Sequence, residues 1–303
     1  MNFNKMDPLM KALRAANQRK VGQTELTTED LKRERHSLEL AGKVATPPIG
    51  VSSEEFSIGD IKAEWIRPDF AHETRHVILD SHGGGYTSGA LGYARILGAK
   101  LALHAGVEVL SYEYRLAPEH PYPAAFEDAM QVWDYLMLQG YGANQVILAG
   151  DSAGGNLTLE ILLALKEQER KLPRAAVLFS PWTDMTATSE SYQTRRENDP
   201  ILTYDYIITV RNAFAPADSD FSDAKYSPLF GDLSGFPPIL IQVGENEILY
   251  DDSKKLYEKL IKENSPVTFQ SFPDGWHVFQ QMPLPMSAQA IKDAAAFIQK
   301  ELY

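Results

Sequence analysis

A serine set between glycines is the feature of this sequence best suited to covalent chemistry. Ser152 stands in the run GDSAGG at positions 150–155. The apolar run 145–149 before it predicts a buried strand, and the stretch 156–168 after it predicts a helix. A tight strand-to-helix turn leaves no room for side chains beside the serine and lifts its hydroxyl above the sheet edge. The motif predicts that Ser152 is a nucleophile.

A glycine-rich loop predicts the hydrogen-bond donors that such a nucleophile needs. The sequence HGGGY at positions 82–86 follows the strand-like run 77–80. Acyl transfer turns the attacked carbonyl into an oxyanion, which backbone N–H groups can stabilise. We expect these N–H groups to come from Gly84, Gly85 and Ala153. Tyr86, next to the loop, is predicted to line the substrate pocket, with packing under a covering segment as the alternative.

A serine nucleophile needs a general base, and His277 is the candidate. Of the seven histidines, only His277 lies well downstream of Ser152. It stands in a loop with Pro273 and Gly275 that follows the strand-like run 266–271. A histidine can act as a base only after its imidazole has lost its proton, and the usual imidazole pKa lies between about 6 and 7. Activity is therefore expected to rise with pH over that range.

Four carboxylates that follow the strand-like run 238–243 are candidates for the acid that orients the histidine. Glu247 stands a few residues beyond that strand, where a loop can reach the histidine, and is the predicted acid. Glu245 is a candidate supporting group. Asp251 and Asp252 have the residue type that caps a helix N-terminus, and a helix is predicted to follow them.

Composition narrows the classes of partner. The chain has 29 Lys and Arg against 41 Asp and Glu, for a formal net charge of −12, which argues against nucleic acid and anionic membrane surfaces. There is no cysteine, so thiolate metal sites and disulfides are excluded. His72 and His76 are four residues apart, but the residues between them lead from a loop into a strand, so we interpret both histidines as solvated and not as a zinc pair. We therefore expect no cofactor and no metal. The start lacks an apolar leader and no run is long enough to span a membrane, which favours a cytoplasmic protein.

The order of elements predicts an α/β protein. Residues 1–45 are predicted to be helical, and residues 46–303 to form one catalytic domain in which strands and helices alternate, as in a mostly parallel sheet flanked by helices. A polar and aromatic segment, about 183–228, interrupts the alternation. Beyond the first strands within 51–80, the predicted strands are 107–112, 145–149, 175–179, 238–243 and 266–271. The predicted helices of this domain are 92–104, 124–139, 156–168, 252–264 and 287–301.

These motifs together resemble the hormone-sensitive-lipase-like family of α/β-hydrolase esterases, the bacterial family IV carboxylesterases. The resemblance includes YRLAPEHP at 114–121 and SPWTD at 180–184, and it extends from about residue 75 to the C-terminus. It implies the α/β-hydrolase fold, a triad of Ser152, Glu247 and His277, and an oxyanion hole from Gly84, Gly85 and Ala153. It also implies that residues 1–45 and 183–228 form a helical cap over the serine.

The acid position departs from the family pattern. The family usually has aspartate there, in a pattern like D-P-L-x-D, whereas this chain reads EILYD at 247–251. A glutamate can also orient an imidazole and stabilise its charged form, but its extra methylene changes the geometry.

The resemblance implies a serine carboxylesterase that hydrolyses small, short-acyl esters, and a homodimer is implied with it. Two alternatives remain open. The same triad could hydrolyse a lactone, an acetylated sugar or an amide. The fold also serves as a non-catalytic binding protein for small molecules, but members of that kind lose the histidine that this chain keeps as His277.

Overall fold

A computed structural model describes residues 8–17, 21–22, 25–44 and 48–303 of the chain, and these residues form one eight-stranded sheet. The strand order is β1-β2-β4-β3-β5-β6-β7-β8. The pairs β1–β2 and β2–β4 are antiparallel, and every other pair is parallel. The strands are β1 Val51–Ile58, β2 Ile61–Pro68, β3 Glu73–Ser81, β4 Val107–Tyr112, β5 Val146–Asp151, β6 Ala175–Phe179, β7 Ile239–Gly244 and β8 Val267–Phe272.

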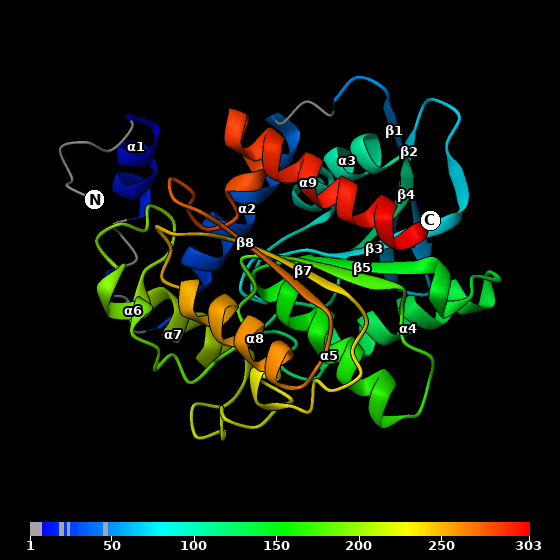
Figure 1. Cartoon of the computed structure of the whole chain (residues 1–303). Helices are drawn as coiled ribbons and strands as arrows, with labels where there is room; N and C mark the ends of the chain where they lie inside the picture. The colour runs from blue at the N-terminus through cyan, green and yellow to red at the C-terminus, as the bar shows by residue number, and fades with distance from the viewer. Residues whose placement is uncertain (1–7, 18–20, 23–24, 45–47) are drawn as a thin grey trace.

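Helices cover both faces of the sheet, as Figure 1 shows. Helices α3 and α9 lie on one face, and α4, α5 and α8 lie on the other. The helices are α1 Pro8–Asn17, α2 Thr28–Val44, α3 Leu91–Ala105, α4 Ala124–Leu138, α5 Ala153–Glu167, α6 Ser191–Thr194, α7 Tyr204–Phe214, α8 Tyr250–Lys262 and α9 Pro285–Leu302. Short 3₁₀ turns are η3 Ala143–Gln145, η4 Pro228–Phe230 and η5 Phe279–Gln281.

Continuous apolar runs in the central strands explain why helices cover both faces of the sheet. Successive strand residues face opposite sides of a sheet. Ile78 and Ile147 accordingly pack with α3 and α9, whereas their neighbours Val77 and Leu148 pack with α4 and α5. A strand buried on both faces has no reason to alternate apolar with polar residues. The prediction of a mostly parallel sheet flanked by helices is confirmed.

The N-terminal helices and the 183–228 segment contact each other. The Tyr206 hydroxyl of α7 donates to Glu34 of α2 at 2.7 Å, and the Asn17 side-chain amide of α1 donates to the Pro200 carbonyl at 3.2 Å. Of the predicted helical region 1–45, residues 1–7, 18–20, 23–24 and 45 lie outside the described part. Among the helices that are described, none combines the length and the apolar character that crossing a membrane requires.

Candidate active site

The turn that carries Ser152 is strained and closely packed. Ser152 has φ 55° and ψ −120°, a conformation that L residues rarely adopt. A Cβ on Gly154 would lie 1.8 Å from the Ser81 carbonyl oxygen, and one on Gly150 would lie 2.3 Å from the Gly154 carbonyl oxygen. Glycine is therefore required at both flanking positions. The turn joins the end of β5 to α5 and presents the serine hydroxyl at the carboxyl edge of the sheet.

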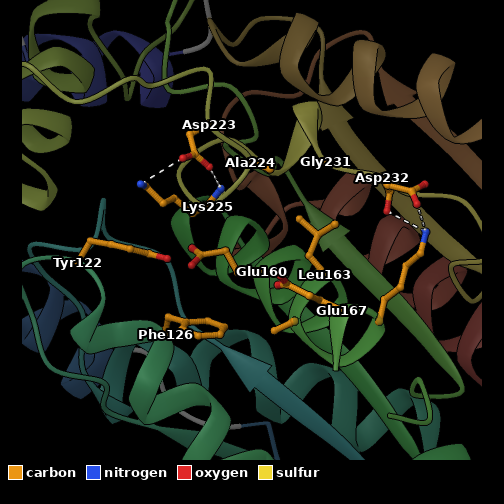
Figure 2. A pocket seen from close by; sticks show the side chains of 12 residues that line it. Tyr122, Phe126, Glu160, Leu163, Glu167, Asp223, Ala224, Lys225, Gly231 and Asp232 are labelled. Carbon is orange, nitrogen blue, oxygen red and sulfur yellow. Dashed lines mark hydrogen bonds and ion pairs between the residues drawn. The ribbon is translucent and has the colours of Figure 1, made fainter. Parts of the chain in front are cut away.

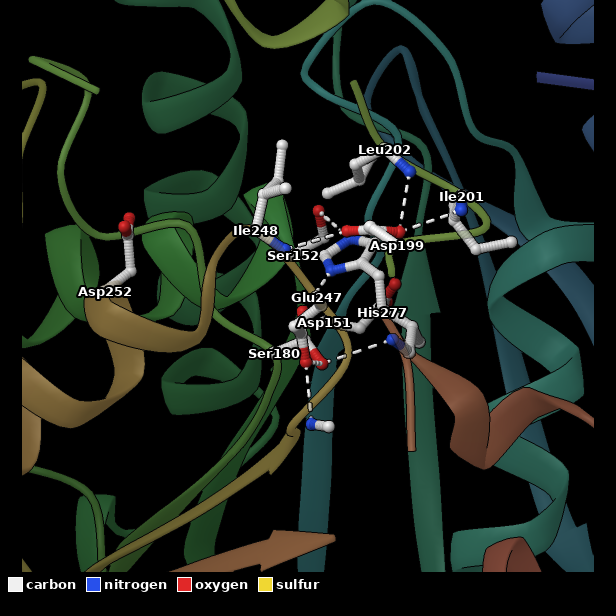
Figure 3. Close-up of polar contacts among 12 residues, drawn as sticks. Asp151, Ser152, Ser180, Asp199, Ile201, Leu202, Glu247, Ile248, Asp252 and His277 are labelled. Carbon is white, nitrogen blue, oxygen red and sulfur yellow. Dashed lines mark hydrogen bonds and ion pairs between the residues drawn. The ribbon is translucent and has the colours of Figure 1, made fainter. Parts of the chain in front are cut away.

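Ser152, His277 and Glu247 form one hydrogen-bonded line (Figure 3). His277 Nε2 lies 2.9 Å from Ser152 Oγ, and His277 Nδ1 lies 2.7 Å from Glu247 Oε2. All three side chains are buried. The serine comes from the β5–α5 turn, the glutamate follows β7, and the histidine follows β8. Parallel neighbouring strands place these three loops at the same edge of the sheet.

The carboxylate of Glu247 is fixed by its second oxygen. Oε1 accepts hydrogen bonds from the Ser180 hydroxyl at 2.8 Å and from the Gly244 amide at 2.7 Å. The Ser180 hydroxyl oxygen in turn accepts the Val278 amide at 3.1 Å, next to His277. Ser180, which no sequence argument singled out beyond its place in SPWTD, thus joins the Glu247 carboxylate to the loop that carries His277.

Electrostatics favour a charged imidazole at His277. Burial alone would lower the pKa of His277, because it penalises the imidazolium. The hydrogen bond to Glu247 and the negative charges of Glu247, Asp199 and Asp151 outweigh this penalty and raise the pKa above its usual 6.5. An imidazole that takes up a proton at this position is therefore stabilised in its charged form.

The neighbouring carboxylates do not contact His277. Glu245 accepts a hydrogen bond from the Ser271 hydroxyl at 2.9 Å, away from the imidazole. The prediction that Asp251 and Asp252 cap α8 is wrong, because Leu249 is the N-cap and both aspartates lie in the first turn. Their carboxylates accept backbone amides of the 183–228 segment instead, including Thr183 and Ser191 at 3.0 and 2.8 Å.

The glycine loop lies directly beside Ser152. Gly84 has φ 116° and Gly85 φ 62°, so both adopt backbone conformations that favour glycine. The loop is anchored to the end of β5, because the Gly83 amide donates to Asp151 Oδ1 at 2.9 Å. Among the described residues, no protein acceptor takes the N–H groups of Gly84, Gly85 and Ala153. These three groups are the ones that the sequence predicts as oxyanion donors.

A cavity of about 420 Å³ opens above Ser152 and His277. Gly84, Gly85 and Trp182 line it, and both the N-terminal region and the 183–228 segment contribute to its walls. The wall residues from the N-terminal region are Leu13, Asn17, Leu26, Asp30, Arg33, Glu34, Ser37 and Leu38. Those from the 183–228 segment are Ile201, Leu202, Tyr206, Ile207 and Val210.

The structure corrects the prediction that Tyr86 lines this cavity. The Tyr86 ring is fully buried and stacks on Phe214 of α7, with ring centroids 4.0 Å apart. Its hydroxyl lies 2.8 Å from Asn156 Oδ1 and 2.7 Å from Glu160 Oε1. A positive φ of 61° turns the side chain away from the glycine loop into the core, which matches the alternative of packing under a covering segment.

Glu160 faces a second hollow that is separate from the serine (Figure 2). This hollow measures about 530 Å³ and is lined by Tyr122, Phe126 and Asp223 among others, but by none of the three residues in the hydrogen-bonded line. Lys225, at its rim, pairs with Asp223 at 3.1 Å. Within the described part of the chain, no group of three or more histidine, aspartate or glutamate side chains could hold a metal ion.

Comparisons with known proteins agree with this geometry. Residues 78–281 match a family model described as the alpha/beta hydrolase fold. An acetyl-hydrolase of Streptomyces hygroscopicus is 37% identical over 262 residues, which cover 86% of this chain and 85% of that protein. A crystal structure of an esterase from the bacterial hormone-sensitive lipase family superposes with a TM-score of 0.89 at 31% identity, covering 98% of this chain and 99% of the other. A crystal structure of EstE5 soaked with p-nitrophenyl butyrate superposes with a TM-score of 0.87 at 32% identity, covering 98% of this chain and 99% of the other.

Proposed function

The chain belongs to the hormone-sensitive-lipase family of the α/β-hydrolase fold, and on that premise we propose that Ser152, His277 and Glu247 make it a serine carboxylesterase. The observation that carries this proposal is the position of His277, which bridges the serine at 2.9 Å and the carboxylate at 2.7 Å. A hydroxyl in line with an oriented imidazole is what nucleophilic acyl transfer requires.

The geometry supports a two-step reaction. His277 Nε2 takes the proton of Ser152 as Oγ bonds to the ester carbonyl carbon, and the carbonyl oxygen becomes an oxyanion. The N–H groups of Gly84, Gly85 and Ala153 stabilise this oxyanion. When the C–O bond to the alcohol breaks, His277 returns the proton to the leaving oxygen. A water molecule then loses a proton to His277 and attacks the acyl carbon. The bond between that carbon and Ser152 Oγ breaks, His277 returns the proton to Oγ, and the carboxylic acid and free Ser152 result.

We propose that the acyl chain is short. The cavity above Ser152 has a volume of about 420 Å³ and its walls are formed by the N-terminal helices and the 183–228 segment. We infer that these two segments act as a cap, which excludes water and limits the acyl and alcohol groups that fit. The similarity to a protein named acetyl-hydrolase also favours a small acyl group.

Initial rates on p-nitrophenyl esters of increasing acyl length test the proposal, with Ser152→Ala measured in parallel. We expect rates that peak at short chains and a loss of at least about 1,000-fold in kcat for Ser152→Ala at an unchanged melting temperature. Retention of the parent rate by Ser152→Ala would contradict the assignment of the nucleophile. Faster turnover of matched lactones, acetylated sugars or amides would change the substrate class and keep the triad.

Assembly and location stay predictions. A homodimer would show twice the monomer mass in light scattering, and a cytoplasmic location would show in cell fractionation. Ligand binding without turnover at any pH between 6 and 9 would favour the non-catalytic alternative over an esterase.

A further inference from the structure

Asp199 is a buried carboxylate that accepts hydrogen bonds from two separate parts of the site. It lies in the 183–228 segment and is 4% exposed. Oδ1 accepts the Ile201 amide at 2.8 Å and the Leu202 amide at 2.9 Å. Oδ2 accepts the Ile248 amide at 2.9 Å. Figure 3 shows these three hydrogen bonds beside the imidazole of His277.

The two sides that Asp199 joins have different parts in the site. Ile201 and Leu202 line the cavity above Ser152. Ile248 is the residue after Glu247, so its amide belongs to the turn that carries the carboxylate bound to His277. One side chain therefore ties a wall of the substrate cavity to the turn of the acid. Charged acceptors hold backbone amides more strongly than neutral ones do, which suits a carboxylate to this position.

Asp199 also places negative charge near His277. The ionisable groups that face the imidazole are Glu247, Asp199 and Asp151, and all three favour its charged form. Burial raises the pKa of Asp199 to about 6, against the opposing influence of His277 and of the amides that it accepts. The pKa of His277 is raised above 6.5. Asp199 therefore carries its negative charge mainly at pH values above about 6.

We propose that Asp199 is a positioning residue of the esterase reaction, which fixes the turn of Glu247 against the cavity wall and stabilises the protonated His277 through its charge. This inference rests on the proposed triad and assigns a role to a residue outside it. The alternative is a purely structural role, in which Asp199 only helps the 183–228 segment to fold.

The substitution Asp199→Asn separates these roles. An asparagine has one acceptor oxygen, so it can satisfy the Ile201 and Leu202 amides or the Ile248 amide but not both. The other side then meets an NH₂ group that cannot accept. The change also removes the charge, which lowers the pKa of His277 and shifts the acidic limb of the kcat profile to lower pH. We expect kcat to fall about tenfold and the limb to shift by about one pH unit.

Two further variants control for charge and folding. Asp218→Asn removes the same charge from an exposed position of the same segment, and we expect parent kcat and an unmoved limb within about twofold and 0.2 pH unit. Asp199→Glu keeps the charge but displaces the carboxylate. We expect its limb to stay near the parent position while kcat falls at least about threefold. This variant decides the question if Asp199→Asn does not fold.

The outcomes separate this inference from the proposed function. If the parent hydrolyses esters, Ser152→Ala does not, and folded Asp199→Asn keeps the parent kcat and limb, then the inference is wrong and the triad stands. A melting temperature that falls without any change in kcat or limb would likewise leave Asp199 a structural residue. If the parent hydrolyses no ester, the proposed function itself fails.

Discussion

At the scale of single residues, Glu247 occupies a position where the family usually has aspartate. The longer side chain reaches His277 while its other oxygen is held by Ser180 and Gly244. The hydrogen bonds from Ser180 and Gly244 thus fix the carboxylate of this longer side chain at the oxygen that does not contact His277. Both oxygens of the Glu247 carboxylate take part in hydrogen bonds. The side chain at this position therefore needs two acceptor oxygens and a negative charge.

We expect Glu247→Gln to lower kcat by about 1,000- to 10,000-fold with little change in KM. A glutamine must turn its NH₂ toward either His277 Nδ1 or the Gly244 amide, so one hydrogen bond is lost and the charge that stabilises the imidazolium disappears. Steady-state kinetics on a short-chain ester measures the effect. Glu245→Gln is the matched control, because Glu245 contacts Ser271 and not the histidine. Equal losses in the two variants would contradict the assignment of Glu247 as the acid.

Residue motifs in the sequence predicted part of this site. Ser152 and the glycine loop could be found because their backbone constraints are local, and His277 because few histidines lie downstream. Ser180 and Asp199 could not be found in this way. Their contacts with Glu247 and Ile248 depend on which strand ends are neighbours, and the sheet order that brings β6 beside β7 is not written in any local pattern.

At the scale of elements, α2 is held against α3 at a contact between two glycines. A Cβ on Gly42 would lie 2.3 Å from the Gly92 carbonyl carbon. Nearer the cavity, Arg35 of the same helix donates to the Thr87 and Ala117 carbonyls and pairs with Glu119. The helix that supplies much of one cavity wall is therefore positioned both near its C-terminal end and at its middle.

We expect Gly42→Ala to raise KM several-fold while kcat changes little. The new methyl group cannot fit against the Gly92 backbone, so α2 must shift away from α3 and the cavity wall shifts with it. The residues that break and form bonds lie on other elements. Steady-state kinetics across acyl lengths measures this, and Lys32→Ala, at an exposed position of α2, is the control. A fall in kcat at constant KM would show that α2 acts on the chemistry and not on substrate fit.

Element types and order were predicted well because strands buried on two faces and amphipathic helices differ in length and pattern. The error at Asp251 and Asp252 has a physical cause. Residue type suggested an N-cap, but a carboxylate satisfies whichever unpaired amides lie nearest, and here these belong to the 183–228 segment. Capping propensity predicts a hydrogen-bond acceptor near the start of a helix, but it does not predict which backbone amides that acceptor will bind.

At the scale of the whole molecule, the fold buries several carboxyl groups under the site. Burial raises the pKa of Asp151 to about 6 and that of Glu160 to about 8. Burial also raises the pKa of Asp80 and Asp252 well above their usual range. Such groups bind protons more tightly in the folded chain than in the unfolded chain, so each contributes stability at low pH that is lost as pH rises. His82, whose pKa burial lowers to about 4, acts in the opposite sense.

Hydrogen-bond geometry supports a neutral Glu160. The Asn156 NH₂ donates to the Trp182 and Tyr226 carbonyls, which fixes Oδ1 as the atom that faces Tyr86. Tyr86 has one hydroxyl proton and two oxygens within reach, at 2.8 Å on Asn156 and 2.7 Å on Glu160. Both contacts are hydrogen bonds only if Glu160 is protonated and donates to the Tyr86 oxygen. If Glu160 were ionised, the Tyr86 hydroxyl could donate its proton to only one of these two oxygens. The other oxygen would then lie against the Tyr86 oxygen with no proton between the two acceptors.

We therefore expect Glu160→Gln to gain stability relative to the parent as pH rises. The contribution of Glu160 is complete below its usual pKa of 4.5 and is lost as pH approaches 8. Glutamine is neutral throughout and can donate to Tyr86 in the same way. The difference in unfolding free energy between variant and parent should change in favour of the variant by up to about 1.4 kcal/mol per pH unit within this window. Chemical denaturation at pH 5, 6, 7 and 8 measures it, with the exposed Glu167→Gln of the same helix as control. A difference that is constant across these pH values would mean that Glu160 keeps an ordinary pKa, and that the Tyr86 hydroxyl serves only one of its two neighbours.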